Sequence, residues 1–261
     1  MAKLKKISVQ PLTPLEALDL KVASTQHVDV SELPGDVQAK LHSDLMKIAQ
    51  KSEGVIVINS FGETPFVSTV MRTSKEKKKF YAFPEPNPVH LYYKIGIGHL
   101  EAAEIKKKEF THMHGAHPEK EFEGFGTYFE SLVTGIVFML MTMEGFVNQL
   151  LSEGAVYAVN GNEKSKADVE WMNLTDKIMF VVPEITGIDF RVTNAQAYGR
   201  ITKLNEIRNE LIHLKKVEAA NFTIYQDLFK QLLDFQILES ADAVFEFVTT
   251  LKPGYFKEQA E

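Results

Sequence analysis

The 261-residue sequence has no cysteine, a single tryptophan and no long uninterrupted apolar run. Without cysteine, disulfide bonds and thiolate chemistry are excluded. The most apolar stretch covers only residues 132–143 before Glu144 closes it. A membrane-spanning helix needs about 20 residues, and no secretory apolar run follows the first residues, MAKLKK. We therefore expect a soluble cytoplasmic protein that does not associate with a membrane.

Basic residues are also scarce, since 29 lysines and arginines stand against 35 aspartates and glutamates and leave a net charge of −6. Proteins that bind nucleic acid non-specifically are usually basic. Any contact with RNA must therefore come from a local basic patch. The chain is 44% hydrophobic, which is enough to bury a sizeable core in one large domain or two modest ones.

The first part of the sequence predicts a mixed α/β region. Residues 1–35 are punctuated by prolines, and Asp36 is a plausible cap for a helix over residues 37–51. A small antiparallel sheet is expected from three stretches rich in β-branched and aromatic residues: 55–58, 66–71 and 79–83.

A second helix is predicted over residues 89–110, after a run of prolines. Gly96 and Gly98 weaken this helix, and without a third glycine they do not form a dinucleotide-binding loop. The polar residues 111–127 are expected to form a linker or the start of the next domain. We place the domain boundary at 120/121, with residues 1–120 as a mixed α/β accessory region and 121–261 as a helical bundle.

The second part of the sequence predicts long helices. Residues 128–151 are apolar through their middle and should form the central, buried helix. Residues 159–166 form a polar loop, and Trp171 is expected in the core or at its rim. Three further helices complete an antiparallel four-helix bundle: 168–182, 200–216 and 219–249.

The helix over 200–216 carries the residues that point to chemistry. It has an apolar stripe on one side, formed by Ile201, Leu204, Ile207, Leu211 and Leu214. Asn205, Asn209 and His213 recur every four residues and share another face. Arg208 lies at the edge of the stripe, about 140° from His213 around the helix.

The segment Arg208-Asn209-Glu-Leu-Ile-His213 resembles the R-N-x-x-x-H signature of HEPN domains, which are small antiparallel helical bundles. Many HEPN domains are metal-independent ribonucleases. They also carry an acidic residue followed four positions later by asparagine on the first long helix, as Glu144 and Asn148 do here. A polar pair on a buried helix needs partners, and contact with Arg208 or Asn209 would supply them. The resemblance covers roughly residues 128–250.

This resemblance implies an endoribonuclease without cofactors. His213 would act as general acid or base and Arg208 would stabilise the charged phosphate, giving a 2′,3′-cyclic phosphate and a 5′-hydroxyl. It also implies a homodimer in which two motif helices form one basic cleft. The local basic rim would consist of Arg200, Lys203, Lys215 and Lys216. Such proteins are often toxins or antiphage-defence effectors, some with an antitoxin or defence partner.

Two other functions fit the sequence. Glu144 and Arg208 could form a purely structural pair in a non-catalytic HEPN-like module that dimerises or binds a nucleotide or protein. A metal-dependent hydrolase could instead use His112, His114 and His117, which have metal-binding side chains. These histidines lie in a glycine-containing segment, where a solvated loop is the simpler reading.

Overall fold

The computed structural model describes residues 4–12, 33–51, 56–61, 64–72, 80–110, 117–213 and 225–259. The chain divides into two compact units, Gln10–Asn87 and a larger one made of Met1–Val9 with Pro88–Glu261. These divisions differ from the predicted boundary at 120/121, because the helix that begins at Pro88 packs along the central helix of the larger unit. The protein is mainly helical, as the sequence predicted.

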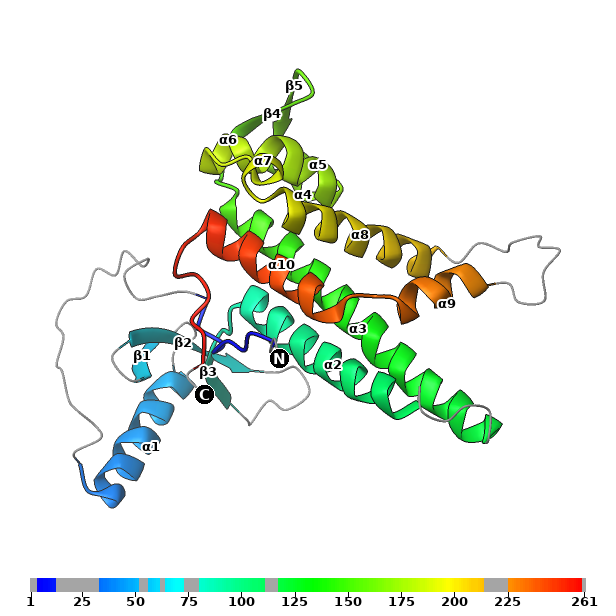
Figure 1. The fold of residues 1–261 in the computed structure, drawn as a ribbon. Coiled ribbons are helices and arrows are strands. Elements are labelled where there is room, and N and C mark those ends of the chain that lie inside the picture. The colour runs from blue at the N-terminus through cyan, green and yellow to red at the C-terminus, as the bar shows by residue number, and fades with distance from the viewer. Residues whose placement is uncertain are drawn as a thin grey trace. The chain divides into compact units, whose positions relative to one another are not determined.

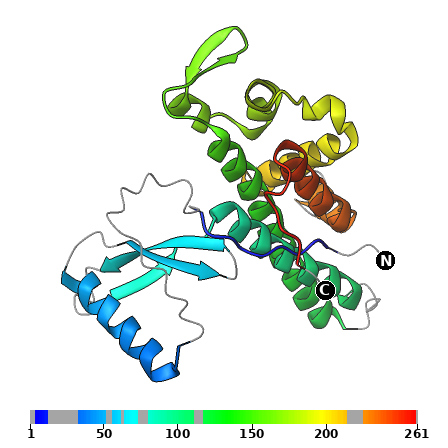
Figure 2. The ribbon, with the colours of Figure 1, turned by 90° about the vertical axis from the view of Figure 1, so that its left-hand side faces the viewer.

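The smaller unit contains helix α1 (Gly35–Lys51) and three strands, shown in Figure 2. The strands are β1 (Ile56–Phe61), β2 (Thr64–Arg72) and β3 (Phe80–Pro84), paired antiparallel in the order β1-β2-β3. The predicted helix and small sheet are therefore present. Asp36 lies in the first turn of α1 and not before it, since the carbonyl of Pro34 already accepts the backbone N–H groups of Val37 and Gln38.

Helices α2 (Pro88–Phe110) and α3 (Pro118–Leu150) form the base of the larger unit, as Figure 1 shows. Residues 118–127, predicted as linker, are the first turns of α3. The two helices approach closely at glycines. A Cβ on Gly135 would lie 2.6 Å from Leu100 Cδ2, and one on Gly96 would lie 2.8 Å from Met139 Cε. Gly96 therefore weakens α2 in isolation but allows it to pack tightly against α3.

Helix α3 is longer than its apolar centre suggested. Its 33 residues make it long and apolar enough to cross a membrane by length and composition alone. Half of its most apolar window is buried within the chain. Aromatic side chains of α3, α7 (Phe190–Thr193) and α10 (Ile237–Leu251) meet around Phe146. The Phe146 ring lies 6.0 Å from that of Phe247, and the Phe247 ring lies 5.1 Å from that of Phe190.

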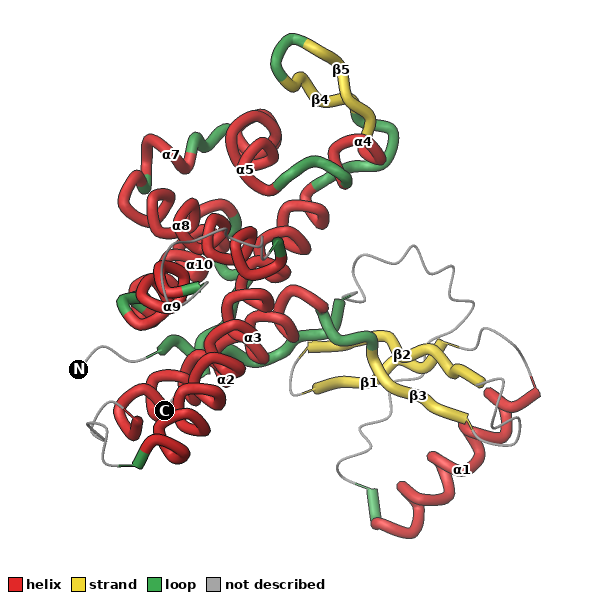
Figure 3. Tube along the Cα trace, turned by 90° about the vertical axis from the view of Figure 1, so that its right-hand side faces the viewer, coloured by secondary structure: helices red, strands yellow, loops and turns green. Residues whose placement is uncertain are grey.

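A β-hairpin follows α3 where the sequence analysis predicted a polar loop. Strands β4 (Val156–Val159) and β5 (Asn162–Ser165) pair antiparallel and project from the end of the helical unit in Figure 3. Asn160 and Gly161 join them with φ angles of 51° and 76°. These angles fit a two-residue turn with positive φ at both positions, for which Asn-Gly is the preferred sequence. The loop prediction was wrong because this local signal was not read.

The helix predicted over 168–182 is broken into short pieces, which are α4 (Lys166–Glu170), α5 (Leu174–Asp176) and the π-helix η3 (Lys177–Val181). Two more short helices follow, α6 (Val182–Thr186) and α7 (Phe190–Thr193). Asn173 starts α5 by accepting the N–H of Asp176. Trp171 lies at the break and is 91% exposed, so its predicted place in the core or its rim was wrong.

Three further helices cover α3: α8 (Ala195–Ile212), α9 (Gln226–Leu233) and α10 (Ile237–Leu251). Figure 1 shows α8 and α10 side by side above α3. The helix predicted over 219–249 is interrupted between α9 and α10. The Tyr128 hydroxyl donates to the carbonyl of Leu232 at 2.5 Å, and the Lys107 ammonium donates to that of Leu233. These bonds satisfy carbonyls at the end of α9 and fix the corner.

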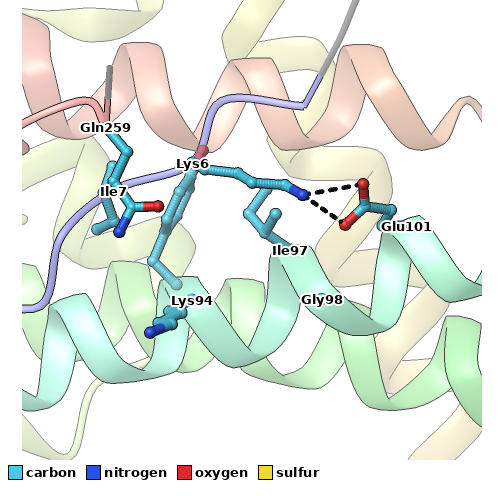
Figure 4. Close-up of a pocket in the computed structure, with 8 residues that line it drawn as sticks. Lys6, Ile7, Lys94, Ile97, Gly98, Glu101 and Gln259 are labelled. Carbon is cyan, nitrogen blue, oxygen red and sulfur yellow. Dashed lines mark hydrogen bonds and ion pairs between the residues drawn. The ribbon is translucent and has the colours of Figure 1, made fainter. Parts of the chain in front are cut away.

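The two ends of the chain meet along α2. Ile7 pairs with Glu258 in an antiparallel bridge, and Ser8 N–H donates to Lys257 O at 3.1 Å. Figure 4 shows the Lys6 ammonium reaching the Glu101 carboxylate of α2, at 2.9 Å, across a small pocket. The N-terminal segment is therefore tied to the larger unit.

Candidate functional site

The candidate site lies where α8 crosses the C-terminal part of α3. Glu144 and Asn148 are one turn apart on α3, and Arg208 and Asn209 lie near the end of α8. The apolar stripe of α8 positions this helix, because Ile201, Leu204 and Ile207 are buried against the core. Polar side chains at the edges of both helices are thereby brought together.

Arg208 and Glu144 form the central ion pair of this region. Arg208 Nη2 lies 3.9 Å from Glu144 Oε1, and Arg208 Nη1 donates to Asn209 Oδ1 at 3.0 Å. The Arg208 side chain is 32% exposed and that of Glu144 39%. The contact predicted between the two helices is present. The pair holds the guanidinium without enclosing it, so Arg208 remains accessible from solvent.

Asn148 has a different partner, a buried lysine that the sequence analysis missed. Lys177 Nζ donates to Asn148 Oδ1 at 2.9 Å and to the backbone carbonyl of Glu170 at 2.8 Å. Lys177 is only 2% exposed. Burial lowers the pKa of its ammonium group, and the carboxylates of Glu144 and Glu170 act in the opposite direction. The polar groups on this side of α3 therefore form a network that includes a desolvated cation.

The position of Lys177 depends on a local irregularity. It begins the π-helix η3, immediately before the apolar run Ile178-Met179-Phe180-Val181-Val182. π-helical turns are rare and are often found at functional sites. A lysine at the start of so apolar a run was the signal available in the sequence. Its pairing with Asn148, 29 residues earlier, was not readable from local spacing.

The other two members of the predicted polar face, Asn205 and His213, do not take part in the Arg208–Glu144 contact. Asn205 Nδ2 donates to Thr175 Oγ1 at 3.4 Å and links α8 to α5. Helix α8 ends at Ile212, and His213 is its C-cap, with its backbone N–H donating to Asn209 O at 3.0 Å. The predicted helix over 200–216 therefore ends early.

His213 is exposed, and its side chain makes no hydrogen bond or ion pair with any residue that the structure describes. None of the described residues engages the imidazole. A single chain therefore does not join the Arg208 and His213 side chains directly.

The predicted basic rim is divided. Arg200 and Lys203 line a separate pocket with α9 and α10, on another side of α8 from Arg208. Lys215, Lys216 and Leu214 lie outside the described residues. Arg200 and Lys203 therefore require an explanation of their own.

The predicted histidine cluster is only partly described. His112 and His114 lie outside the described residues, and His117 is the exposed N-cap residue of α3. Within the described ranges, no group of three or more histidine or acidic side chains is arranged to hold a metal ion.

The comparisons with known proteins do not identify the chain: no protein-family model, characterised protein or solved structure matches it. The function must therefore be argued from the residues and their geometry.

Proposed function

We propose that this protein is a metal-independent endoribonuclease, acting in the cytoplasm as a toxin or antiphage-defence effector. The observation that supports the proposal best is the Glu144–Arg208–Asn209 arrangement, in which an arginine is oriented by two neighbours yet remains partly exposed. An arginine fork in this state can receive phosphate oxygens. The HEPN-like bundle would lie within roughly residues 128–250, where α3, α8 and α10 supply its long helices.

In this mechanism the 2′-hydroxyl of RNA attacks the adjacent phosphorus, and the bond from phosphorus to the 5′-oxygen breaks. His213 takes the proton of the attacking hydroxyl or donates one to the leaving oxygen, a role suited to imidazole near neutral pH. Arg208 stabilises the negative charge that develops on the phosphate oxygens. Asn209 accepts a hydrogen bond from the guanidinium and so helps to orient it.

The proposed active form is a homodimer. Arg208 and His213 lie about 140° apart around α8, and no contact joins their side chains within the described part of one chain. A second α8 facing the first would complete each site by supplying the missing group. This arrangement also places charges of both copies in one cleft, which an overall acidic protein needs in order to bind RNA.

A non-catalytic module that dimerises or binds another molecule is the second candidate. It is favoured by the same ion pair, because Glu144 already neutralises part of the positive charge of Arg208. In that case the pair would serve α3–α8 packing, and His213 would be an ordinary surface residue.

The test is cleavage of a mixed RNA pool in EDTA by the wild type, His213→Gln and the matched variant His99→Gln, which alters a histidine on α2. We expect wild type and His99→Gln to cleave, and His213→Gln to lose at least about 100-fold in rate. Products should carry 2′,3′-cyclic phosphate ends. A folded wild-type dimer that leaves RNA intact would favour the binding module. If EDTA abolishes cleavage and the His213→Gln variant still cleaves without EDTA, a metal-dependent hydrolase that uses His112, His114 and His117 would be favoured.

A further inference from the structure

Two further cations of α8, Arg200 and Lys203, lie on another side of the helix from the Arg208–Glu144 pair. At about 100° per residue, Arg200 and Lys203 flank the buried Ile207, and Arg208 lies about 100° from the centre of these three residues. Here α8, α9 and α10 enclose a pocket of about 320 Å³. Its lining residues are Arg200, Lys203, Ile207, Lys230, Gln231, Asp234, Phe235, Gln236 and Ser240.

Two cations of this pocket have no partner among the residues that the structure describes. Neither Arg200 nor Lys230 forms a hydrogen bond or ion pair with any of them. Lys203 is engaged, since its ammonium donates to Gln231 Oε1 at 2.8 Å and lies 3.6 Å from Glu206. Arg200 and Lys230 come from different helices and line the same cavity, so the pocket brings together two cations that form no ion pair with the described residues.

The side chain of Ser240, a largely buried residue that lines the pocket, offers a further polar group. Ser240 lines the pocket and is only 6% exposed, yet its hydroxyl makes no hydrogen bond with the described part of the chain. The hydroxyl is therefore available to donate a hydrogen bond to a ligand in the pocket.

The pocket also lies at the N-terminus of α10. The N-cap residue Gln236 makes no side-chain capping bond, so the first-turn amides are not capped in this way. The 15-residue helix directs the positive end of its dipole toward the cavity, although Glu239 in its first turn offsets part of it. Because Tyr128 and Lys107 fix the α9–α10 corner, these donors are held in place without a ligand.

The charges indicate the class of ligand. The lining residues comprise three cations and one carboxylate, Asp234, which leaves a net charge of +2. A phosphate monoester carries nearly two negative charges above pH 7 and offers three acceptor oxygens. Asp234 cannot bind phosphate, but it can accept a hydrogen bond from a hydroxyl of the esterified group. Phe235 and Ile207 supply apolar surface for the carbon skeleton.

We propose that the α8–α9–α10 pocket binds a small, hydroxyl-bearing phosphate monoester. Arg200, Lys230 and Ser240 hold the phosphate at the N-terminus of α10, and Asp234 binds the hydroxyl. This site is separate from the Arg208 face and does not depend on ribonuclease activity. RNA cleavage and binding of the monoester are therefore tested by different measurements.

The experiment is calorimetric titration of the full chain at pH 8 with glycerol 1-phosphate, inorganic phosphate and dimethyl phosphate. Glycerol 1-phosphate should bind at least tenfold more tightly than dimethyl phosphate, which carries one charge and no hydroxyl. Arg200→Gln and Lys230→Gln should each weaken glycerol 1-phosphate binding at least tenfold, because each removes a charged donor. Ser240→Ala should weaken it severalfold. Lys120→Gln, an exposed lysine of α3, is the control and should bind as the wild type does.

Three results would overturn the proposal. They are an absence of binding by all three probes up to about 10 mM, unchanged glycerol 1-phosphate binding in both Arg200→Gln and Lys230→Gln, and equal affinity for the monoester and the diester. Equal affinity would indicate a site for nucleic-acid phosphates. Circular dichroism of each variant establishes that a lost titration signal is not lost folding.

Discussion

The two flanks of α3 are built in opposite ways. Toward α2 the contact is apolar and close, with Gly96 and Gly135 bringing the helices together. Toward η3 and α8 the buried apolar stripe of α8 is joined by polar contacts, in which Glu144 pairs with Arg208 and Asn148 accepts a hydrogen bond from Lys177. Apolar contact secures the fold by burial, whereas the polar flank desolvates charged groups. A protein that needed only a stable bundle could have used the first kind of contact on both sides.

Removing the buried lysine should have the largest effect on stability. Lys177→Ala leaves Asn148 Oδ1 and the Glu170 carbonyl without their donor and opens a cavity. We expect the free energy of unfolding to fall by about 3 kcal/mol. Urea denaturation followed by circular dichroism measures it. Lys120→Ala, at an exposed position on α3, should change it by less than about 0.5 kcal/mol. A loss as small for Lys177→Ala would mean that the polar network does not hold the fold.

Lys177 should also make the free energy of unfolding depend on pH. Burial lowers the pKa of Lys177 below its ordinary 10.5, so the unfolded chain binds this proton more tightly than the folded one. Stability conferred by this group should therefore rise as the pH increases toward 10.5. Between about pH 8 and about pH 10, wild type should gain in free energy of unfolding relative to Lys177→Met. Tyr128, whose pKa burial raises, is present in both proteins and cancels. A constant difference would contradict the lowered pKa.

The apolar flank should be damaged by a single methyl group. The added Cβ of Gly135→Ala would lie 2.6 Å from Leu100 Cδ2 and 3.2 Å from the Leu100 backbone nitrogen, so α2 must shift. We expect a loss of about 2 kcal/mol in the free energy of unfolding. Gly126→Ala is the matched control on the same helix, since no atom lies within 4 Å of its added Cβ. It should stabilise the helix by about 0.5–1 kcal/mol. If the two variants behaved alike, the close approach of α2 and α3 would be refuted.

The sequence predicted the apolar flank better than the polar one. Periodicity indicated α1, α2 and the centre of α3, because helical burial repeats over many residues. The cost of unpaired polar groups on a buried helix also indicated that Glu144 would need a partner such as Arg208. It could not indicate the breaks near Trp171 and Phe235, since these depend on single caps and tertiary hydrogen bonds. The Asn160-Gly161 turn was predictable and was overlooked.

The candidate sites show the same limit. The R-N-x-x-x-H segment is contiguous, so its residues could be named from the sequence, although its helix ends sooner than expected. Lys177 and the α8–α9–α10 pocket bring together residues that are about 30 or more positions apart in the chain. Local sequence patterns do not indicate which distant residues come into contact, because tertiary packing determines those contacts.

The smallest stability change is expected at the accessible part of the polar flank, and it separates the two candidate functions. Arg208→Gln removes an ion pair of 3.9 Å whose side chains are about one-third exposed, and such pairs stabilise by about 0–1 kcal/mol. Lys106→Gln, which breaks the exposed 2.9 Å Lys106–Glu109 pair of α2, provides the reference. If Arg208→Gln lowers the free energy of unfolding by no more than Lys106→Gln does, but abolishes RNA cleavage, Arg208 acts on the substrate. A loss above about 2 kcal/mol without change in cleavage would make Arg208 a structural residue, because the fold and not the reaction would then depend on its charge.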